Sequence, residues 1–135
     1  MRVTSTKPAA KANETRELTI PIRNALNELP GVRVARNNCG MMTDVRGGKV
    51  RYGLGVGSAD LVGIVTVRLL ATCLHCTPEV GRAFCLEVKR PGEKPTDDQV
   101  RWLEAVRRLG GFAAVVLSVE EALQAVERCR SGASQ

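Results

Sequence analysis

A strand, a capped helix and a second strand follow one another in the last third of the chain. Residues 82–89 are rich in strand-forming residues, and Thr96-Asp97-Asp98-Gln99 has the pattern of a capping box, which opens a helix. Gly110-Gly111 ends this helix, and residues 112–117 form a continuous apolar strand. A crossover through a helix joins parallel strands of one sheet and is right-handed, so this stretch predicts an α/β fold.

The rest of the chain supplies further elements around this unit. Apolar residues at helical spacing predict a helix over residues 14–29, in which Pro21 either occupies the first turn, with Thr19 as N-cap, or kinks a helix that begins near Asn13. The expected fold is α/β, with a mixed central sheet flanked by helices in the order α-β-β-β-α-β-α. The other expected elements are a strand at 32–36, a hairpin turning at Gly47-Gly48 with its second arm at 49–52, a strand at 61–70 antiparallel to 82–89, and a helix from Ser118 to about Arg130.

The length fits one domain. Of the 135 residues, 44% are hydrophobic and 25% charged, which is ordinary for a globular protein. We expect a flexible arm at 1–12, a single domain at 13–130 and a flexible tail at 131–135. No apolar run approaches the roughly 20 residues of a membrane helix, and the first dozen residues hold no signal-peptide core. The expected location is therefore cytoplasmic, with no membrane partner.

Positive charge is concentrated in the first part of the chain. Residues 1–55 hold 10 Lys and Arg against 4 Asp and Glu, whereas residues 56–135 hold 10 against 10, so the first 55 residues account for the net charge of +6. A basic surface attracts phosphate backbones. A solvated surface without a nucleic-acid partner is the alternative interpretation.

Five cysteines leave a second question open. An odd number without a secretory signal favours reduced thiols. Cys73 and Cys76 have the spacing of a zinc knuckle, with Cys85 further on and His75 between the pair, but no second knuckle follows. Small residues on a hairpin are the simpler interpretation, and a zinc-stabilised interaction domain remains the rival.

Three charged residues lie on the two central strands. Asp60 precedes the apolar run that starts at Leu61, and Glu87 and Lys89 share one face of the next strand because side chains alternate. Two carboxylates that approach each other need a cation, and oxygen ligands favour Mg²⁺ or Mn²⁺. With a lysine beside them, this is the chemistry of phosphodiester hydrolysis. An ion pair and a strand-end aspartate are the plainer explanation of the same spacing.

The motifs around these residues resemble a known family. Gly57-Ser58-Ala59-Asp60-Leu61 followed by Glu87-Val88-Lys89-Arg90-Pro91-Gly92 is similar to the motif of the PD-(D/E)XK nucleases, and within them to the VRR-NUC family. The resemblance covers residues 14 to 126. Supporting stretches are the N-terminal helix with its glutamate, Arg36-Asn37-Asn38, Lys94 to Gln99, and Gly110-Gly111-Phe112.

The resemblance assigns roles by position. Asp60 and Glu87 would bind the metal, with the Val88 carbonyl as a further ligand, and Lys89 would be the catalytic lysine. Gln99 matches a glutamine near the site, although it also fits a purely structural role in the capping box. The glutamate of the N-terminal helix matches Glu17, with Glu14 as the alternative. Candidate DNA-contacting residues are Arg36, Asn37, Asn38, Arg51 and Ser58, and basic residues of the first part, such as Arg33, Arg46 and Lys49, could extend that path.

The implied function is that of the family. The resemblance implies a restriction-endonuclease-like fold and an enzyme that hydrolyses DNA phosphodiester bonds with Mg²⁺ or Mn²⁺. Small stand-alone members, often encoded by phages and then working in the host cytoplasm, resemble Holliday junction resolvases, which implies a homodimer and branched DNA. A nucleic-acid-binding module without catalysis is the alternative. His75 and Trp102 have no expected catalytic role, and we expect Trp102 to be a packing residue.

Overall fold

The structure, a computed structural model, describes residues 14–69 and 78–132. Its main sheet is formed by β1 (Val32–Arg36), β4 (Leu61–Arg68), β5 (Glu79–Val88) and β6 (Phe112–Val116), in the order β1-β4-β5-β6. The β1–β4 and β4–β5 pairs are antiparallel, and β5 and β6 are parallel. The mixed α/β class and the mixed sheet are therefore confirmed.

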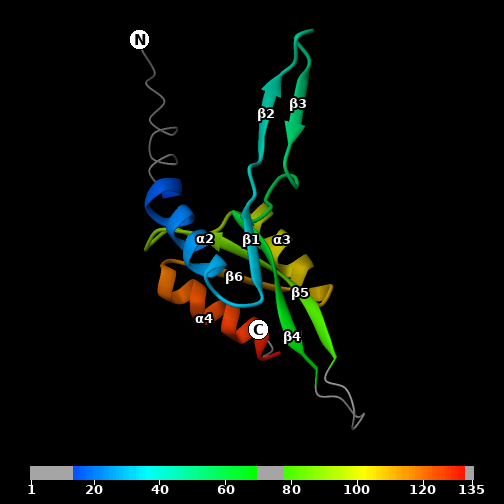
Figure 1. The fold of residues 1–135 in the computed structure, drawn as a ribbon. Helices are drawn as coiled ribbons and strands as arrows, with labels where there is room; N and C mark the ends of the chain where they lie inside the picture. Colours follow the sequence, from blue (N-terminus) through cyan, green and yellow to red (C-terminus); the bar gives the residue numbers. More distant parts are fainter. Residues whose placement is uncertain (1–13, 70–77, 133–135) are drawn as a thin grey trace.

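Helices cover both faces of this sheet (Figure 1). The helices α2 (Ile20–Asn27) and α4 (Val119–Arg130) pack against each other and against one face. The helix α3 (Asp97–Arg108) packs on β5 and β6 from the other face. Within the described ranges, no helix combines the length and apolar character needed to cross a membrane.

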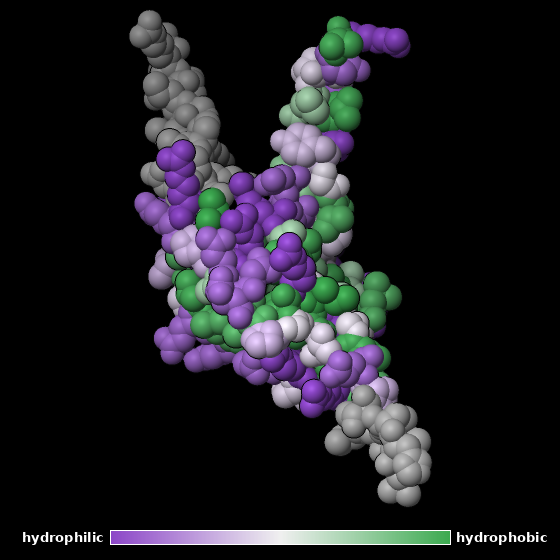
Figure 2. All heavy atoms as spheres, viewed as in Figure 1, coloured by the Kyte–Doolittle hydropathy of each residue, from purple (hydrophilic) through white to green (hydrophobic). Residues whose placement is uncertain are grey.

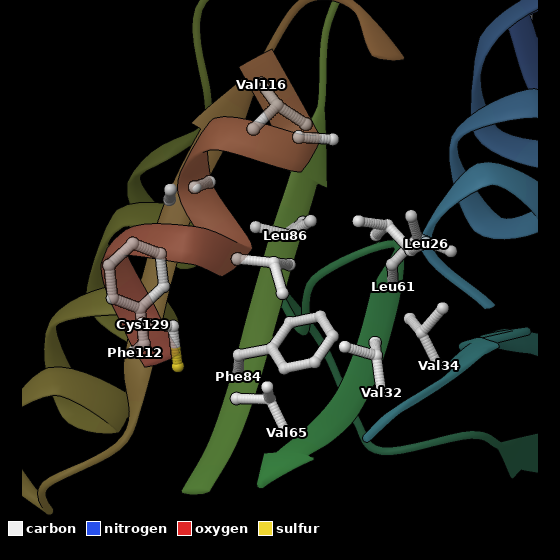
Figure 3. Packing of buried hydrophobic residues seen from close by; sticks show 14 of the residues in the cluster. Leu26, Val32, Val34, Leu61, Val65, Phe84, Leu86, Phe112, Val116 and Cys129 are labelled. Atoms are coloured by element: carbon white, nitrogen blue, oxygen red, sulfur yellow. The ribbon is translucent and has the colours of Figure 1, made fainter. Parts of the chain in front are cut away.

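The alternation of side chains on β5 divides its residues between the two faces. Phe84, Leu86 and Val88 are fully buried in the larger core, which they share with residues of β4, β6, α2 and α4 (Figure 3). Cys85 points to the opposite face, where a smaller apolar cluster lies under α3. Because the period is two, Glu87 shares the face of Cys85 and is held toward α3.

Pro21 lies inside the N-terminal helix, not at its start. The chain is helical from Glu14, is π-helical in η1 (Thr15–Thr19) and continues as α2. Proline cannot donate an N–H to the carbonyl four residues earlier, and its ring crowds that carbonyl; the wider π turn accommodates both effects. Of the two predicted alternatives, the structure has the helix that begins near Asn13 and is distorted at Pro21; Thr19 is buried, has helical φ and ψ and makes no side-chain cap bond.

A second, two-stranded sheet separates β1 from β4. It pairs β2 (Gly40–Thr43) with β3 (Lys49–Tyr52) through the turn at Gly47 and Gly48, as the hairpin pattern predicted. In the described chain five strands therefore precede α3, whereas the expected order counted three. We call residues 40–52 the ribbon.

Some expectations fall outside the described residues. Residues 1–12, the loop with Cys73, His75 and Cys76, and the last three residues belong to this group. Of the proposed zinc ligands only Cys85 is described. Its side chain is buried in the apolar cluster with Ala59, Leu103 and Ala113, and Trp102 packs against this cluster, as expected for a packing residue. This environment favours a structural role for Cys85.

We predict that Gly63→Ala destabilises the fold by about 1–3 kcal/mol, measured by denaturant unfolding. A Cβ at this β4 position would lie 2.5 Å from Phe84 Cζ and 2.6 Å from the Arg33 carbonyl oxygen. The backbone oxygen is fixed by strand pairing, so it cannot move away. The neighbouring Ile64→Ala is the matched control. Its side chain is half exposed, so its loss should cost less than about 1 kcal/mol. Equal stability of Gly63→Ala and the wild type would contradict this packing.

Candidate functional site

Strand register brings the two predicted carboxylates together. Leu61 pairs with Leu86, so Asp60, one residue earlier on the antiparallel strand, lies opposite Glu87. The backbone N–H of Val88 donates to Asp60 Oδ2 at 3.0 Å. This bond fixes the Asp60 carboxylate at the end of β5 and leaves its other oxygen for a ligand.

Glu87 is a fully buried charged residue. Its Oε1 accepts from Lys89 Nζ at 2.8 Å and from Gln99 Nε2. Its Oε2 is buried and has no hydrogen-bond partner. Burial raises the pKa of Glu87 to about 7, and the negative charge of Asp60 adds to the rise, while Lys89 opposes it. A buried carboxylate oxygen without a donor is costly, which points to a missing cation or proton at that atom.

Lys89 supplies the positive charge of the site. Burial by itself would lower its pKa, but the hydrogen bond and charge of Glu87, together with the charges of Asp60 and Glu14, raise the pKa overall. The side chain is 15% exposed, and its backbone N–H donates to the Val116 carbonyl at 3.0 Å. Strand β6 thus fixes a protonated lysine beside the carboxylates.

Gln99 completes the capping box of α3 and also contacts Glu87. Its Oε1 accepts from the Thr96 backbone N–H at 2.8 Å, and its own backbone N–H donates to Thr96 Oγ1 at 3.3 Å, which completes the predicted capping box. Its Nε2 donates to Glu87. The cap therefore sets the orientation of a side chain that contacts the buried carboxylate.

The N-terminal helix brings Glu14, more than Glu17, toward the carboxylate pair. The Glu17 carboxylate is 66% exposed and pairs with Arg90 at 3.1 Å. Partial burial raises the pKa of Glu14, and the charges of Glu93 and Asp60 add to the rise, against Lys89 and Arg90. Glu14 is thus within electrostatic range of Asp60 and Lys89. The signal was available, because Glu14 stands at four-residue intervals before the core residues Leu18 and Ile22.

Asn37 holds the loop that presents Asp60. Its backbone N–H donates to the Asp60 carbonyl at 2.8 Å, and its side-chain Nδ2 donates to Ser58 Oγ at 2.8 Å and to the Ala59 carbonyl at 2.9 Å. Ser58 Oγ in turn donates to the Gly55 carbonyl at 2.7 Å. These bonds position the loop, which the sequence pattern did not reveal. That Asn37 and Ser58 contact DNA stays a prediction.

A glycine lets this loop lie against α3. Gly57 has a φ of +78°, and a Cβ there would lie 2.5 Å from the Asp98 carbonyl oxygen. Close approach of the loop to the start of α3 thus requires glycine. As a result, the loop before Asp60 and the start of α3 line the same groove.

The groove is about 650 Å³ in volume, and it is lined both by residues next to the buried carboxylate and by residues of the ribbon. Asp60 and Gln99 are among the first group, and Arg51 and Tyr52 are among the second. The five candidate DNA-contacting residues all line it, namely Arg36, Asn37, Asn38, Arg51 and Ser58. The structure therefore brings these residues and the carboxylate site into one continuous surface.

The candidate ligands for a metal ion are the carboxylates of Asp60 and Glu87 and the backbone carbonyl of Val88. Within residues 14–69 and 78–132, no group of three or more His, Cys, Asp and Glu side chains is arranged to hold a metal. Asp60 and Glu87 nevertheless face each other, and Glu87 Oε2 is without a partner. Hard oxygen donors of this kind fit Mg²⁺ or Mn²⁺, which keep several water ligands and need few from the protein.

We predict that Mn²⁺ raises the melting temperature of the wild type by about 5–10 °C at saturating concentration, because the ion binds only the folded carboxylate pair. In Glu87→Gln this rise should be absent. The metal-free variant should melt at the same temperature as the wild type or higher, because a buried charge facing Asp60 is removed. Differential scanning fluorimetry measures both effects.

Glu104→Gln is the matched control, since it removes an exposed carboxylate from α3. It should retain the full Mn²⁺ effect. An equal Mn²⁺ effect in Glu87→Gln and the wild type would show that the ion binds elsewhere.

Comparison with known proteins adds no family assignment. The chain matches no protein-family model, and it matches no curated protein. The functional interpretation therefore depends on the geometry of Asp60, Glu87, Lys89 and Gln99 and on the motifs that contain them.

Proposed function

We propose that this chain is a Mg²⁺- or Mn²⁺-dependent DNA endonuclease on a restriction-endonuclease-like fold, similar to the VRR-NUC nucleases. The observation that carries the proposal is the buried Glu87 carboxylate, which faces Asp60, is paired with Lys89 and has one oxygen without a partner. A strand-edge ion pair, the plainer explanation, would be exposed to solvent. Burial of this pair costs free energy, so a functional reason for it is favoured.

The two carboxylates would hold the metal ion. Asp60 and Glu87 Oε2 are the side-chain ligands, and the Val88 carbonyl is a further ligand by resemblance. The chemistry that a divalent ion supplies here is activation of water and neutralisation of phosphate charge. Glu14 would strengthen the negative field from the helix side, with Glu17 held away from it by Arg90.

Lys89 and Gln99 would organise the reacting groups. A protonated Lys89 is suited to orient the attacking water and to offset negative charge that builds on the phosphate. Gln99 donates to Oε1 of Glu87, and this bond would leave Oε2 of Glu87 available to a metal ion. Both roles depend on prior positioning, which is the main contribution that a protein makes to phosphoryl transfer.

The groove supports DNA as the substrate. Asp60, Arg36 and Arg51 all line it. Both arginines belong to residues 1–55, which hold the excess of positive charge. By resemblance we propose a homodimer that acts on branched DNA, with one site for each of two strands.

We predict that Lys89→Ala reduces cleavage of DNA by about 10²–10³-fold, because the charge next to the scissile phosphate is lost. The substrates are supercoiled plasmid and a four-way junction with Mn²⁺, and the readout is the rate of product formation on gels. DNA binding should change little, and the melting temperature should fall but leave the protein folded at the assay temperature, because Glu87 loses a buried partner. Asp60→Ala and Glu87→Ala should abolish cleavage and metal binding together.

Arg108→Ala is the control, because this exposed residue lies at the far end of α3. It should cleave at the wild-type rate. If the wild type cleaves no DNA with either metal but binds it, the alternative of a non-catalytic nucleic-acid-binding module is correct. Full activity of any of the three site variants would mean that the site is misplaced.

The contact of Gln99 with Glu87 can be tested separately from its role in the cap of α3. Thr96→Ala and Gln99→Ala each remove half of the capping box and should each cost about 0.5–2 kcal/mol of stability. Of these two residues, only Gln99 contacts Glu87. We therefore predict that Gln99→Ala lowers the cleavage rate by at least about ten-fold, whereas Thr96→Ala retains most of it. Equal losses in the two variants would reduce Gln99 to a capping residue.

A further inference from the structure

The ribbon, residues 40–52, extends away from the body of the protein and packs on neither face of the main sheet (Figure 1). All its paired residues are exposed except Gly40, which is partly buried. Figure 2 shows hydrophobic and hydrophilic residues side by side along this projection. A two-stranded hairpin alone is only marginally stable in water, so a ribbon of this kind is expected to gain stability from a partner.

Register divides the ribbon into two unlike faces. Met42 pairs with Val50, and Gly40 pairs with Tyr52, so these four residues share one face. A Cβ at Gly40 would collide with the Tyr52 ring, which shows that the ring covers the glycine. On this face the Tyr52 ring therefore covers the backbone at Gly40, while Met42 and Val50 remain exposed.

The opposite face is cationic. It carries Met41 paired with Arg51, and Thr43 paired with Lys49. In the described part of the chain, neither Lys49 nor Arg51 forms an ion pair. The one acid of the ribbon, Asp44, is held in the turn, where its Oδ1 accepts from the backbone N–H groups of residues 46 and 48 at 2.9 and 2.7 Å. Nothing on the cationic face offsets its charge.

The cationic face is continuous with the carboxylate groove. Arg51 and Met41 of this face line the groove together with Asp60, and Gly40 and Tyr52 of the other face line it where the ribbon begins and ends. A polyanion that runs past the carboxylates would therefore continue along Arg51 toward Lys49. A two-stranded ribbon has the width that the major groove of duplex DNA admits, about 12 Å.

We propose that the ribbon is a DNA-holding arm, which lies in a groove of the duplex next to the cut site and contacts phosphates through Lys49 and Arg51, with Arg46 at the turn. This inference rests on the proposed nucleic-acid function and specifies how the duplex is held. Such contacts contribute affinity that is insensitive to sequence and falls with salt. They do not take part in the chemistry.

The test measures binding of a fluorescent 30-base-pair duplex by anisotropy in EDTA, so that no cleavage occurs. Lys49→Ala/Arg51→Ala should weaken binding at least about ten-fold at 0.1 M salt and reduce the slope of log affinity against log salt by about 1.8. The matched control is Arg68→Ala/Arg108→Ala, which removes two exposed charges from sites away from the ribbon. It should change the slope by less than half as much.

The outcomes separate this proposal from the nuclease proposal. A protein that cuts DNA while the two double variants bind equally would overturn the arm and leave the nuclease intact. A protein that cuts nothing but shows the expected difference in slope would retain the arm and lose the nuclease. Sedimentation supplies a further check on the apolar face, with the variant Met42→Ser/Val50→Ser. If this variant is a monomer where the wild type is a dimer, and if Lys49→Ala/Arg51→Ala has no effect on DNA binding, the ribbon is an interface between two copies of the chain. The proposal is then wrong.

Discussion

Burial of the Glu87 carboxylate is the interaction on which the site depends. Taking this charge out of water is unfavourable, and the facing charge of Asp60 makes it more so. Lys89 and Gln99 compensate at one oxygen only. The β4–β5 register, the α3 cap and the end of β6 each fix one of these residues. A divalent cation would provide the partner that the remaining oxygen lacks, and so the proposed function explains a feature that stability alone does not.

The same constraint accounts for the shape around the site. Asp60 must face Glu87 from the end of β4, and the loop before it is held by Asn37 and lies against α3 because residue 57 is glycine. These restraints leave a groove that opens toward the ribbon. Rigid strands thus supply the carboxylates, while the segment between β1 and β4 supplies the surface that would guide a substrate. Loops positioned by a rigid scaffold are a common location for such surfaces.

Local patterns predicted much of this arrangement. The capped α3, the parallel β5–β6 pair and the shared face of Glu87 and Lys89 follow from caps and alternation alone. The π turn before Pro21 did not follow, because a proline can begin a helix or interrupt one, and only packing decides. The use of Asn37 as a loop anchor depends on a partner 21 residues away. The position of Glu14 could have been predicted, because Glu14 stands at four-residue intervals before Leu18 and Ile22.

The most direct test is the position of the metal ion itself. Crystals soaked with Mn²⁺ and measured near the manganese absorption edge would locate it by anomalous scattering. We predict one peak between Asp60 and Glu87, about 2.1 Å from Glu87 Oε2. The Lys89 and Gln99 contacts to Oε1 should persist. Bound Mn²⁺ at other carboxylates only, with none between Asp60 and Glu87, would contradict the account.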